Sequence, residues 1–180
     1  KDNHNGGTHT HADMLSFELC IDNEDIIVDT GSYEYTRDIK TRNYFRSTKM
    51  HNTIEVDEKD QYELDYDRFS KFKTRAKPKH IKWESNNEYD IYIGEHNGYA
   101  RLEDPFIHRR EFKYLKNKRE LFITDQLISN ESHNIKSYFH FKPGLDVEIK
   151  DNFITVYCKK KKVILSFVDI EKINLKKYKD

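Results

Sequence analysis

The chain has 180 residues, with 32 basic and 32 acidic side chains and a formal net charge of zero. This balance excludes the chain-wide basic field that is typical of nucleic-acid-binding proteins, so an acidic polymer would have to meet a local basic patch. No apolar run approaches the roughly 20 residues that a membrane-spanning helix needs, and no signal-peptide pattern is visible. The two cysteines, Cys20 and Cys158, are too few for a disulfide framework and are expected to be buried free thiols.

Alternation of apolar and polar residues with a period of two predicts strands along most of the chain. In chain order, the predicted strands cover residues 17–21, 26–28, 52–57, 89–93, 109–115, 121–128, 137–141, 147–150, 153–158 and 163–168. No long segment has helical periodicity, so we predict one all-β domain over residues 1–180, an antiparallel β-sandwich. Residues 30–50 and 58–80 are the weakest stretches for strand and the best candidates for functional loops.

Two histidines, His9 and His11, are separated by one residue near the start of the chain. On an extended backbone they point the same way, because side chains alternate between the two sides of a strand. Imidazole is the commonest metal ligand near neutral pH. The pair therefore indicates a candidate metal site, although two polar surface histidines would give the same pattern.

Two more candidate ligands lie at the ends of predicted strands: Asp29 follows an apolar run, and His51 precedes another strand. Separately, Asp29 could start a turn and His51 could be an exposed loop residue. Together with His11 they could surround one divalent cation, and a ligand set of two nitrogens and one oxygen favours zinc. A cupin also uses two histidines at this spacing, but Glu18 comes too late after His11 for that fold.

Three blocks of sequence between residues 9 and 61 resemble the heparinase II/III-like family of polysaccharide lyases. Residues 9–19 (HTHADMLSFEL) are similar to the family's HxHAD-x-LSFEL strand, and residues 27–33 (IVDTGSY) to its IVDPG-x-Y turn, with Thr30 in place of the usual Pro. Residues 43–53 contain NYFRST followed by HNT, which resembles the family's YFRST…HNT segment, and Gln61 continues the match. The order of the blocks is specific to the family, and it covers roughly a third of the chain.

The resemblance implies the C-terminal β-sandwich of such a lyase, of the super-sandwich type, without the N-terminal α/α toroid that forms the other wall of the family's cleft. These lyases degrade uronic-acid polysaccharides by β-elimination, in which a base removes the C5 proton and an acid assists departure of the C4 oxygen. By motif position, His11, Asp29 and His51 would hold a divalent cation, most simply Zn²⁺, in a structural role. Without its helical domain, the chain is expected to be nearly inactive.

The resemblance also implies roles for three side chains in the cleft. His9 would act in catalysis or neutralise the substrate carboxylate. Tyr44 and Arg46 would lie nearby and touch substrate, and the fork of an arginine suits both oxygens of a carboxylate. A packed aromatic ring for Tyr44 and a structural ion pair for Arg46 are the alternatives, and Asp13 could orient a histidine or cap a turn.

The expected partners are an acidic uronate polysaccharide and the helical domain of the same protein, with a periplasmic or extracellular location for the parent protein. A non-catalytic carbohydrate-binding or structural domain in surface-polysaccharide metabolism is the alternative function. A metal-dependent hydrolase would need a carboxylate base beside the metal, for which Asp13 is the nearby candidate. Two lysine-rich stretches, residues 71–79 and 159–162, could meet an acidic sugar, but the favoured interpretations are a solvated strand edge for the first and a turn between strands for the second.

Overall fold

The computed structural model describes residues 10–33, 36–67, 76–159 and 161–176, and every structural statement below concerns these residues. The chain divides into two compact units. Unit 1 contains residues 1–17 and 29–140, and unit 2 contains residues 18–28 and 141–180. Each unit is described by itself, and the single domain over residues 1–180 stays a prediction.

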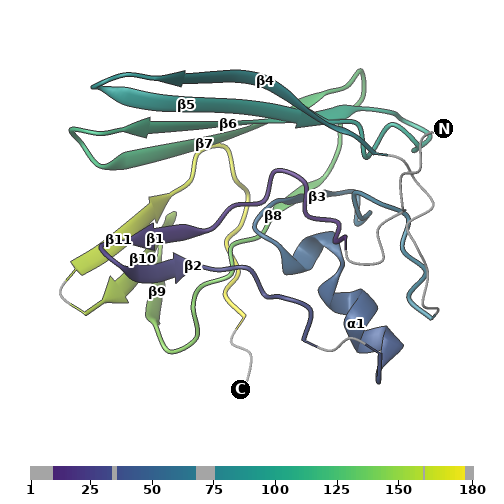
Figure 1. The fold of residues 1–180 in the computed structure, drawn as a ribbon, viewed down its shortest axis with the longest axis horizontal. Coiled ribbons are helices and arrows are strands. Elements are labelled where there is room, and N and C mark those ends of the chain that lie inside the picture. Colours follow the sequence, from purple (N-terminus) through teal and green to yellow (C-terminus); the bar gives the residue numbers. More distant parts are fainter. Residues whose placement is uncertain (1–9, 34–35, 68–75, 160, 177–180) are drawn as a thin grey trace. The chain divides into compact units, whose positions relative to one another are not determined.

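The largest element of unit 1 is a four-stranded antiparallel sheet in the order β4-β5-β6-β7 (Figure 1). Its strands are β4 (Pro78–Ser85), β5 (Tyr89–His96), β6 (Ile107–Leu115) and β7 (Glu120–Ile128). Along β7, every second residue is exposed and the residues between them are half-buried, so the two faces of the sheet differ in their exposure to solvent. This alternation is the sequence signal that predicted the strand.

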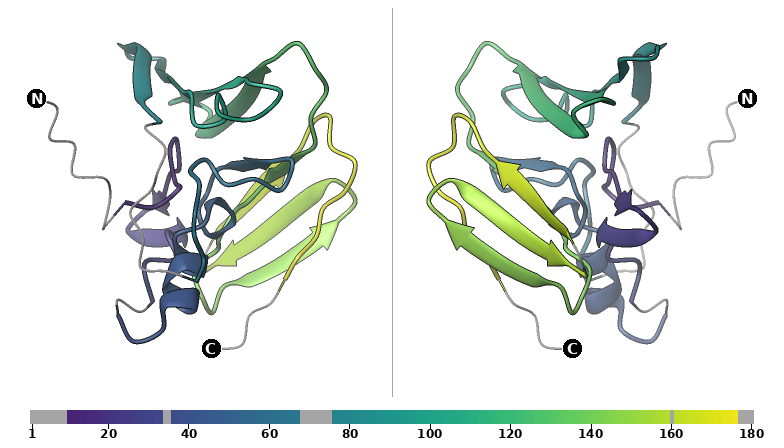
Figure 2. Two further views of the ribbon diagram at one scale, coloured as in Figure 1. Left: turned by 90° about the vertical axis from the view of Figure 1, so that its right-hand side faces the viewer. Right: turned by 90° about the vertical axis from the view of Figure 1, so that its left-hand side faces the viewer.

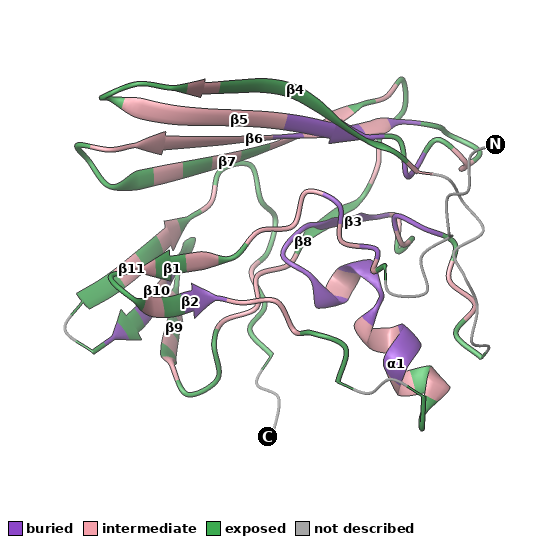
Figure 3. Ribbon diagram, viewed as in Figure 1, coloured by how far each residue is buried: buried purple, intermediate pink, exposed green. Residues whose placement is uncertain are grey.

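A second, short antiparallel pair in unit 1 joins β3 (Ile54–Val56) to β8 (Ile135–Ser137). All three residues of β3 are buried (Figure 3). Leu127 of β7 packs against the buried cluster, so the short pair and the larger sheet share a core. The cluster consists of Ile54, Val56, Tyr99 and Phe106.

Between Asp29 and β3, unit 1 contains one short helix, α1 (Ile39–Phe45), and a single 3-10 turn, η1 (Thr48–Met50). The Asp38 carboxylate caps α1 by accepting a hydrogen bond of 3.1 Å from the Thr41 amide. The sequence analysis treated this stretch as a loop, because a helix of 7 residues is too short to show a clear period. No helix in the described residues is long and apolar enough to cross a membrane.

Unit 2 combines a hairpin with a three-stranded antiparallel sheet in the order β11-β10-β9 (Figure 2). The hairpin pairs β1 (Leu19–Ile21) with β2 (Glu24–Ile27), and the sheet contains β9 (Asp146–Lys150), β10 (Phe153–Cys158) and β11 (Lys161–Ser166). The buried side chains of unit 2 come from β2 and β10, which are in contact. They are Ile26, Ile27, Ile154, Val156 and Cys158.

The antiparallel all-β fold predicted from the sequence is confirmed, with three differences. The strand β4 was missed, because its eight residues are almost all exposed and do not alternate. The strand predicted at residues 137–141 ends at Ser137. Both cysteines are free, but Cys20 is exposed, so only Cys158 is the buried thiol that was expected.

Candidate functional site

His11 is held by an extended segment that lies against the end of α1. The Ala12 amide donates to the Arg46 carbonyl at 2.9 Å, and the Arg46 side chain donates from Nε to the Thr10 carbonyl at 3.1 Å. These two hydrogen bonds fix the backbone on either side of His11. The ring of His11 therefore has a defined direction although it belongs to no strand, and its Nε2 lies 3.3 Å from the Ser32 hydroxyl.

Asp29 and His51 form a close pair in unit 1. Oδ2 of Asp29 lies 2.6 Å from Nδ1 of His51, and Oδ1 of Asp29 accepts a hydrogen bond of 2.8 Å from the Gly31 amide. Burial tends to raise the pKa of Asp29, but the hydrogen bonds from His51 and Gly31 outweigh it and lower the pKa. An ionised carboxylate only accepts hydrogen bonds, so His51 donates from Nδ1.

The other ring nitrogen of His51 is the unusual feature of this region. The His51 side chain is fully buried, yet its Nε2 has no hydrogen-bond partner among the described residues. Since Asp29 accepts the Nδ1 proton, Nε2 of the neutral ring presents a lone pair. A buried polar atom without a partner costs about 1–3 kcal/mol, so such an atom calls for a ligand or another functional reason.

His11 lies beside this unpaired nitrogen. The centroids of the His11 and His51 rings are 5.0 Å apart. Burial, together with the neighbouring His51 ring and the Arg46 and Arg42 side chains, lowers the pKa of His11 to about 4, although Asp29 opposes the shift. His11 is therefore neutral at pH 7 and can donate a lone pair to a cation, but it is a weak general base.

Two other titratable groups face the cluster formed by His11, Asp29 and His51. Burial raises the pKa of Asp13, and the neighbouring His51 opposes this shift. Burial lowers the pKa of His140, whose Nε2 lies 3.0 Å from the Lys49 carbonyl. The cluster thus combines neutral imidazoles with two carboxylates that burial and hydrogen bonding move in opposite directions, a pattern typical of functional sites.

The fit of a metal ion to this cluster is partial. Two imidazoles and one carboxylate are a suitable donor set for a divalent ion such as zinc, and Nε2 of His51 is a buried donor that a cation would satisfy. In the described parts of the chain, however, no three His, Cys, Asp or Glu side chains are gathered as a ready set of ligands. Asp29 instead contacts the Nδ1 side of His51, the position of a carboxylate that orients a ligand histidine.

The remaining predicted site residues have different surroundings. His9 lies outside the described residues. Tyr44 is half-buried on α1, its ring packs edge-on against Phe45 at 5.9 Å, and the Lys49 ammonium lies 4.7 Å from its centroid. Arg46 is buried, and its guanidinium donates to the Thr10 carbonyl and to the Asn43 side chain. These partners are structural but uncharged, so the ion pair that the sequence left open as an alternative stays a prediction. Contact of Tyr44 and Arg46 with substrate stays a prediction.

Gln61 holds the segment that contains His11, a role that the sequence did not predict. Its fully buried side-chain amide donates to the Met14 carbonyl at 3.1 Å and accepts from the Met14 amide at 2.7 Å, as a neighbouring strand would. The same amide nitrogen reaches the Thr53 hydroxyl at 3.2 Å, which connects the segment to the residues after His51. The match of Gln61 to the family pattern was the available signal, but its role needed the fold.

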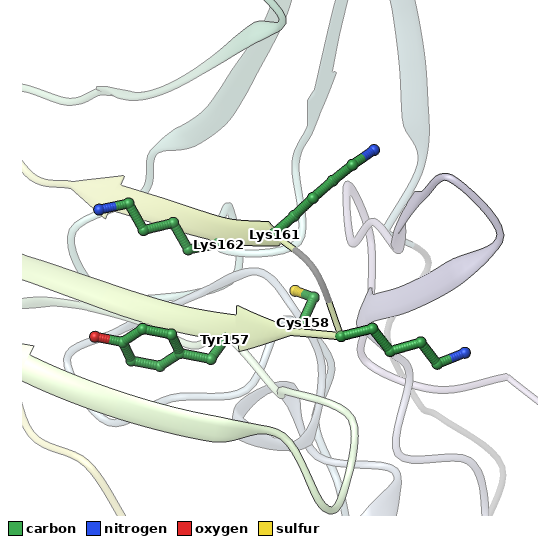
Figure 4. Close-up of a pocket in the computed structure, with 5 residues that line it drawn as sticks. Tyr157, Cys158, Lys161 and Lys162 are labelled. Carbon is green, nitrogen blue, oxygen red and sulfur yellow. The ribbon is translucent and has the colours of Figure 1, made fainter.

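A cavity of about 530 Å³ lies in unit 2, at the turn between β10 and β11, and none of the candidate residues lines it. Its walls include Tyr157, Cys158 and three lysines, one in the turn and two at the start of β11. Figure 4 shows the Lys161 and Lys162 side chains extending away from the strands. The turn predicted at residues 159–162 is confirmed only at Lys159, because β11 already begins at Lys161 and residue 160 lies outside the described residues.

Comparison with known proteins gives one family and several homologous folds. The family model described as "Heparinase II/III-like, C-terminal" matches residues 2–169. A heparin-sulfate lyase from Bacteroides stercoris is 25% identical over 139 residues, which are 76% of this chain and 18% of that protein. All three blocks that resemble the family, residues 9–19, 27–33 and 43–53, lie inside the family match, as does Gln61.

Two solved structures share the fold. A heparan sulfate lyase from Pedobacter heparinus has a TM-score of 0.72 and 20% sequence identity, over 91% of this chain and 24% of that one. The crystal structure of heparinase III has a TM-score of 0.69 and 21% identity, over 89% of this chain and 23% of that one. The chain therefore spans about a quarter or less of the length of these relatives.

Proposed function

Because this chain belongs to the heparinase II/III-like family, as its C-terminal domain, we propose that it forms one wall of the cleft of a polysaccharide lyase. The substrate class is an acidic, uronate-containing glycosaminoglycan, since the relatives are named for heparin and heparan sulfate. The reaction is β-elimination. The observation that carries the proposal is the cluster of His11, Asp29 and His51, which coincides with the family's motifs and contains a buried nitrogen without a partner.

We further propose that the cluster holds a divalent cation, zinc by its donor chemistry. Nε2 of His51 and the neutral ring of His11 are the nitrogen donors, and Asp29 either joins them or orients His51 through Nδ1. Such an ion would supply positive charge that ties the segments of the cleft wall together. Elimination needs no metal-bound hydroxide, so its role is structural.

The chain's own contribution to the reaction is to bind and orient the uronate. Removal of the C5 proton leaves negative charge on the uronate carboxylate, which neutral or cationic donors must stabilise. His9, by its motif position, is the proposed donor or catalytic group. His11 has a pKa of about 4, so it suits binding of a cation or a carboxyl group better than proton abstraction near neutral pH.

A second candidate function is a domain that binds an acidic glycan without cleaving it. The observation that favours it is the burial of Arg46, whose guanidinium is already occupied by the Thr10 carbonyl and the Asn43 side chain. The guanidinium expected to grip the carboxylate would have to leave these partners first. Under this alternative, the chain binds the cation but takes no part in β-elimination.

The first experiment is elemental analysis of the purified chain after exposure to zinc, beside a His11→Ala, His51→Ala double variant. We expect about one equivalent of zinc in the parent and none in the double variant. His133→Ala is the matched control, since His133 also pairs with an aspartate, Asp57, at 2.7 Å but lies outside the cluster. Equal zinc contents in parent and double variant, or none in either, would refute the metal site.

The second experiment separates the two functions. The chain is tested for heparan sulfate binding and, by ultraviolet absorbance of the new C4–C5 double bond, for elimination. Binding with negligible turnover is the expected result for a domain that supplies one wall of a cleft. Sustained turnover by the chain alone would disprove the need for a helical partner, and failure to bind any acidic glycan would count against both functions.

A further inference from the structure

The sheet of unit 1 buries a row of polar side chains on one face, near the ends of β5 and β6. His96, His108 and Arg110 are each at most 1% exposed. His96 stands opposite His108 in the register of β5 and β6, and Arg110 stands opposite Asp125 in the register of β6 and β7. Buried charges and imidazoles are costly unless each has partners, so the contacts of this row are informative.

These side chains form one directed chain of hydrogen bonds. The Gly98 amide lies 3.2 Å from Nδ1 of His96, so that nitrogen accepts and Nε2 of His96 carries the proton. Nε2 of His96 then donates to Nδ1 of His108 at 2.9 Å, and Nε2 of His108 donates to Asp125 at 2.7 Å. Each ring is thereby fixed in one neutral tautomer.

Arg110 connects the Asp125 end of this chain to the candidate site. Its Nε and Nη2 donate to the two carboxylate oxygens of Asp125 at 2.7 and 2.9 Å. Its Nη1 donates to the carbonyls of Leu15, at 2.9 Å, and Asn52, at 2.8 Å. Leu15 follows His11 by four residues and Asn52 follows His51 directly, so one guanidinium holds both histidine-bearing segments.

Gly94 allows the segment that contains Leu15 to lie close to the sheet. It stands opposite Arg110 in the sheet, and a Cβ atom at Gly94 would lie 2.7 Å from Cδ2 of Leu15. The histidine-bearing segment therefore rests directly on the sheet at this point. At this point the segment presents the Leu15 carbonyl, to which Arg110 donates.

We infer that Arg110, locked by Asp125 and the His108–His96 pair, is a positioning residue that sets the distance and orientation of His11 relative to His51. This inference rests on the proposed function only for the identity of what the two histidines bind. The planar fork of the guanidinium is essential, because four hydrogen bonds leave it in fixed directions. A lysine in its place keeps the charge but cannot hold both carbonyls and both carboxylate oxygens.

The test compares Arg110→Lys with Arg109→Lys. Arg109 is the adjacent residue on the opposite face of β6, and it also forms paired hydrogen bonds to a carboxylate, that of Glu95, at 2.7 and 3.1 Å. The first readout is the ring ¹H–¹⁵N correlation spectrum of the histidines, which reports tautomers without any metal. The second is the affinity for Co²⁺, measured by visible absorption.

In the parent protein, we expect His96 and His108 as Nε2–H tautomers and His51 as an Nδ1–H tautomer. Arg110→Lys should shift or broaden the His51 and His11 signals and weaken Co²⁺ binding at least tenfold, as loss of an outer partner of a metal ligand does. Arg109→Lys should leave both readouts unchanged. A folded Arg110→Lys protein with parental His11 and His51 signals would overturn the inference.

The two proposals fail in different ways. If the parent binds no Co²⁺ but Arg110→Lys still alters the His51 ring, the metal site is wrong and the positioning role stands. If Co²⁺ binds equally to parent and Arg110→Lys, the metal site stands and the positioning role is wrong. Should Arg110→Lys not fold, Asp125→Asn is measured instead, because it keeps an oxygen for Arg110 and His108 and removes only the charge.

Discussion

Two groups of histidines in unit 1 differ in how completely their ring nitrogens are hydrogen-bonded. In the row on the sheet, each ring nitrogen of His96 and His108 has a partner, ending at Gly98 and at Asp125. In the cluster, Asp29 satisfies one nitrogen of His51, and the other has no partner among the described residues. Complete hydrogen bonding identifies a structural network, and one missing partner identifies the place where a ligand can bind.

The largest effect is expected from removal of the Asp125 carboxylate, the only anion in the buried row of His96, His108 and Arg110 described above. Asp125→Ala leaves the buried guanidinium of Arg110 without a counter-charge, so we expect a loss of about 3–5 kcal/mol in the free energy of unfolding. Urea denaturation measures this loss. The double variant Arg110→Met, Asp125→Leu should recover only part of it, because neither charge then remains buried but the Leu15 and Asn52 carbonyls and Nε2 of His108 lose their partners. Equal losses in the single and double variants would show that the ion pair itself stabilises the fold.

The comparison also predicts that only the cluster responds to a metal ion. At a free zinc concentration about 100-fold above its Kd, binding to the folded state alone stabilises the chain by about 2.7 kcal/mol. We expect this gain as a higher Tm in the parent and not in His51→Ala. His133→Ala, which removes a histidine outside both groups, should keep the zinc-dependent shift. A shift retained in His51→Ala would locate the ion elsewhere.

A smaller effect tests how closely the backbone must approach the cluster. A Cβ atom at Gly98 would lie 2.6 Å from the Gln61 carbonyl, so Gly98→Ala forces the Gln61 backbone to move. We expect a cost of about 1–3 kcal/mol in unfolding free energy, as for other overpacked sites. Since Gln61 holds both backbone groups of Met14, the zinc-dependent shift in Tm should also shrink. A stable variant with unchanged zinc response would show that this contact is dispensable.

A dependence of stability on pH tests the same buried histidines without changing any residue. Burial lowers the pKa of His96 to about 2 and also lowers that of His108, whereas both rings in the unfolded chain titrate near pH 6.5. The unfolded state therefore binds more protons below about pH 6.5, and stability falls as the pH drops, by up to about 1.4 kcal/mol per pH unit for each ring. Denaturation at a series of pH values measures the slope.

His96→Gln is the control for that slope, because the amide can still donate to His108 but does not titrate. The slope should decrease by the contribution of one ring. His11, with its pKa lowered to about 4, adds to the slope in the parent and in the variant alike. An unchanged slope in His96→Gln would mean that this ring is protonated in the folded state.

The sequence predicted the parts of this fold that depend on local pattern. The alternation along residues 121–128 and 153–158 gave β7 and β10 nearly to the residue. It could not give β4, an edge strand whose exposed residues follow no apolar period and whose register shifts between His80 and Lys82. It could not give α1 either, because tertiary contacts of Arg42 and Asn43, rather than a long amphipathic pattern, bury one side of the helix.

The candidate site was predicted only in part, because sequence motifs identify its residues but not their tertiary contacts. His11, Asp29 and His51 were found through their motifs, and the structure brings His51 beside both of the others. Their role as ligands stays a prediction. The contacts of Arg110 with Leu15 and Asn52 could not be found, because they join residues 95 and 58 positions apart and depend on the strand register.

The divided course of unit 2 has a consequence for the order in which the chain folds during synthesis. The β1–β2 hairpin is made early, but its partners in the unit come from the last part of the chain: Ile27 bridges Phe141, and the Lys142 amide donates to the Ile26 carbonyl at 3.0 Å. Contacts of such high sequence separation form late. Asp29 follows this hairpin directly. Residue 142 must therefore be synthesised before β2, which precedes Asp29, has its native neighbours.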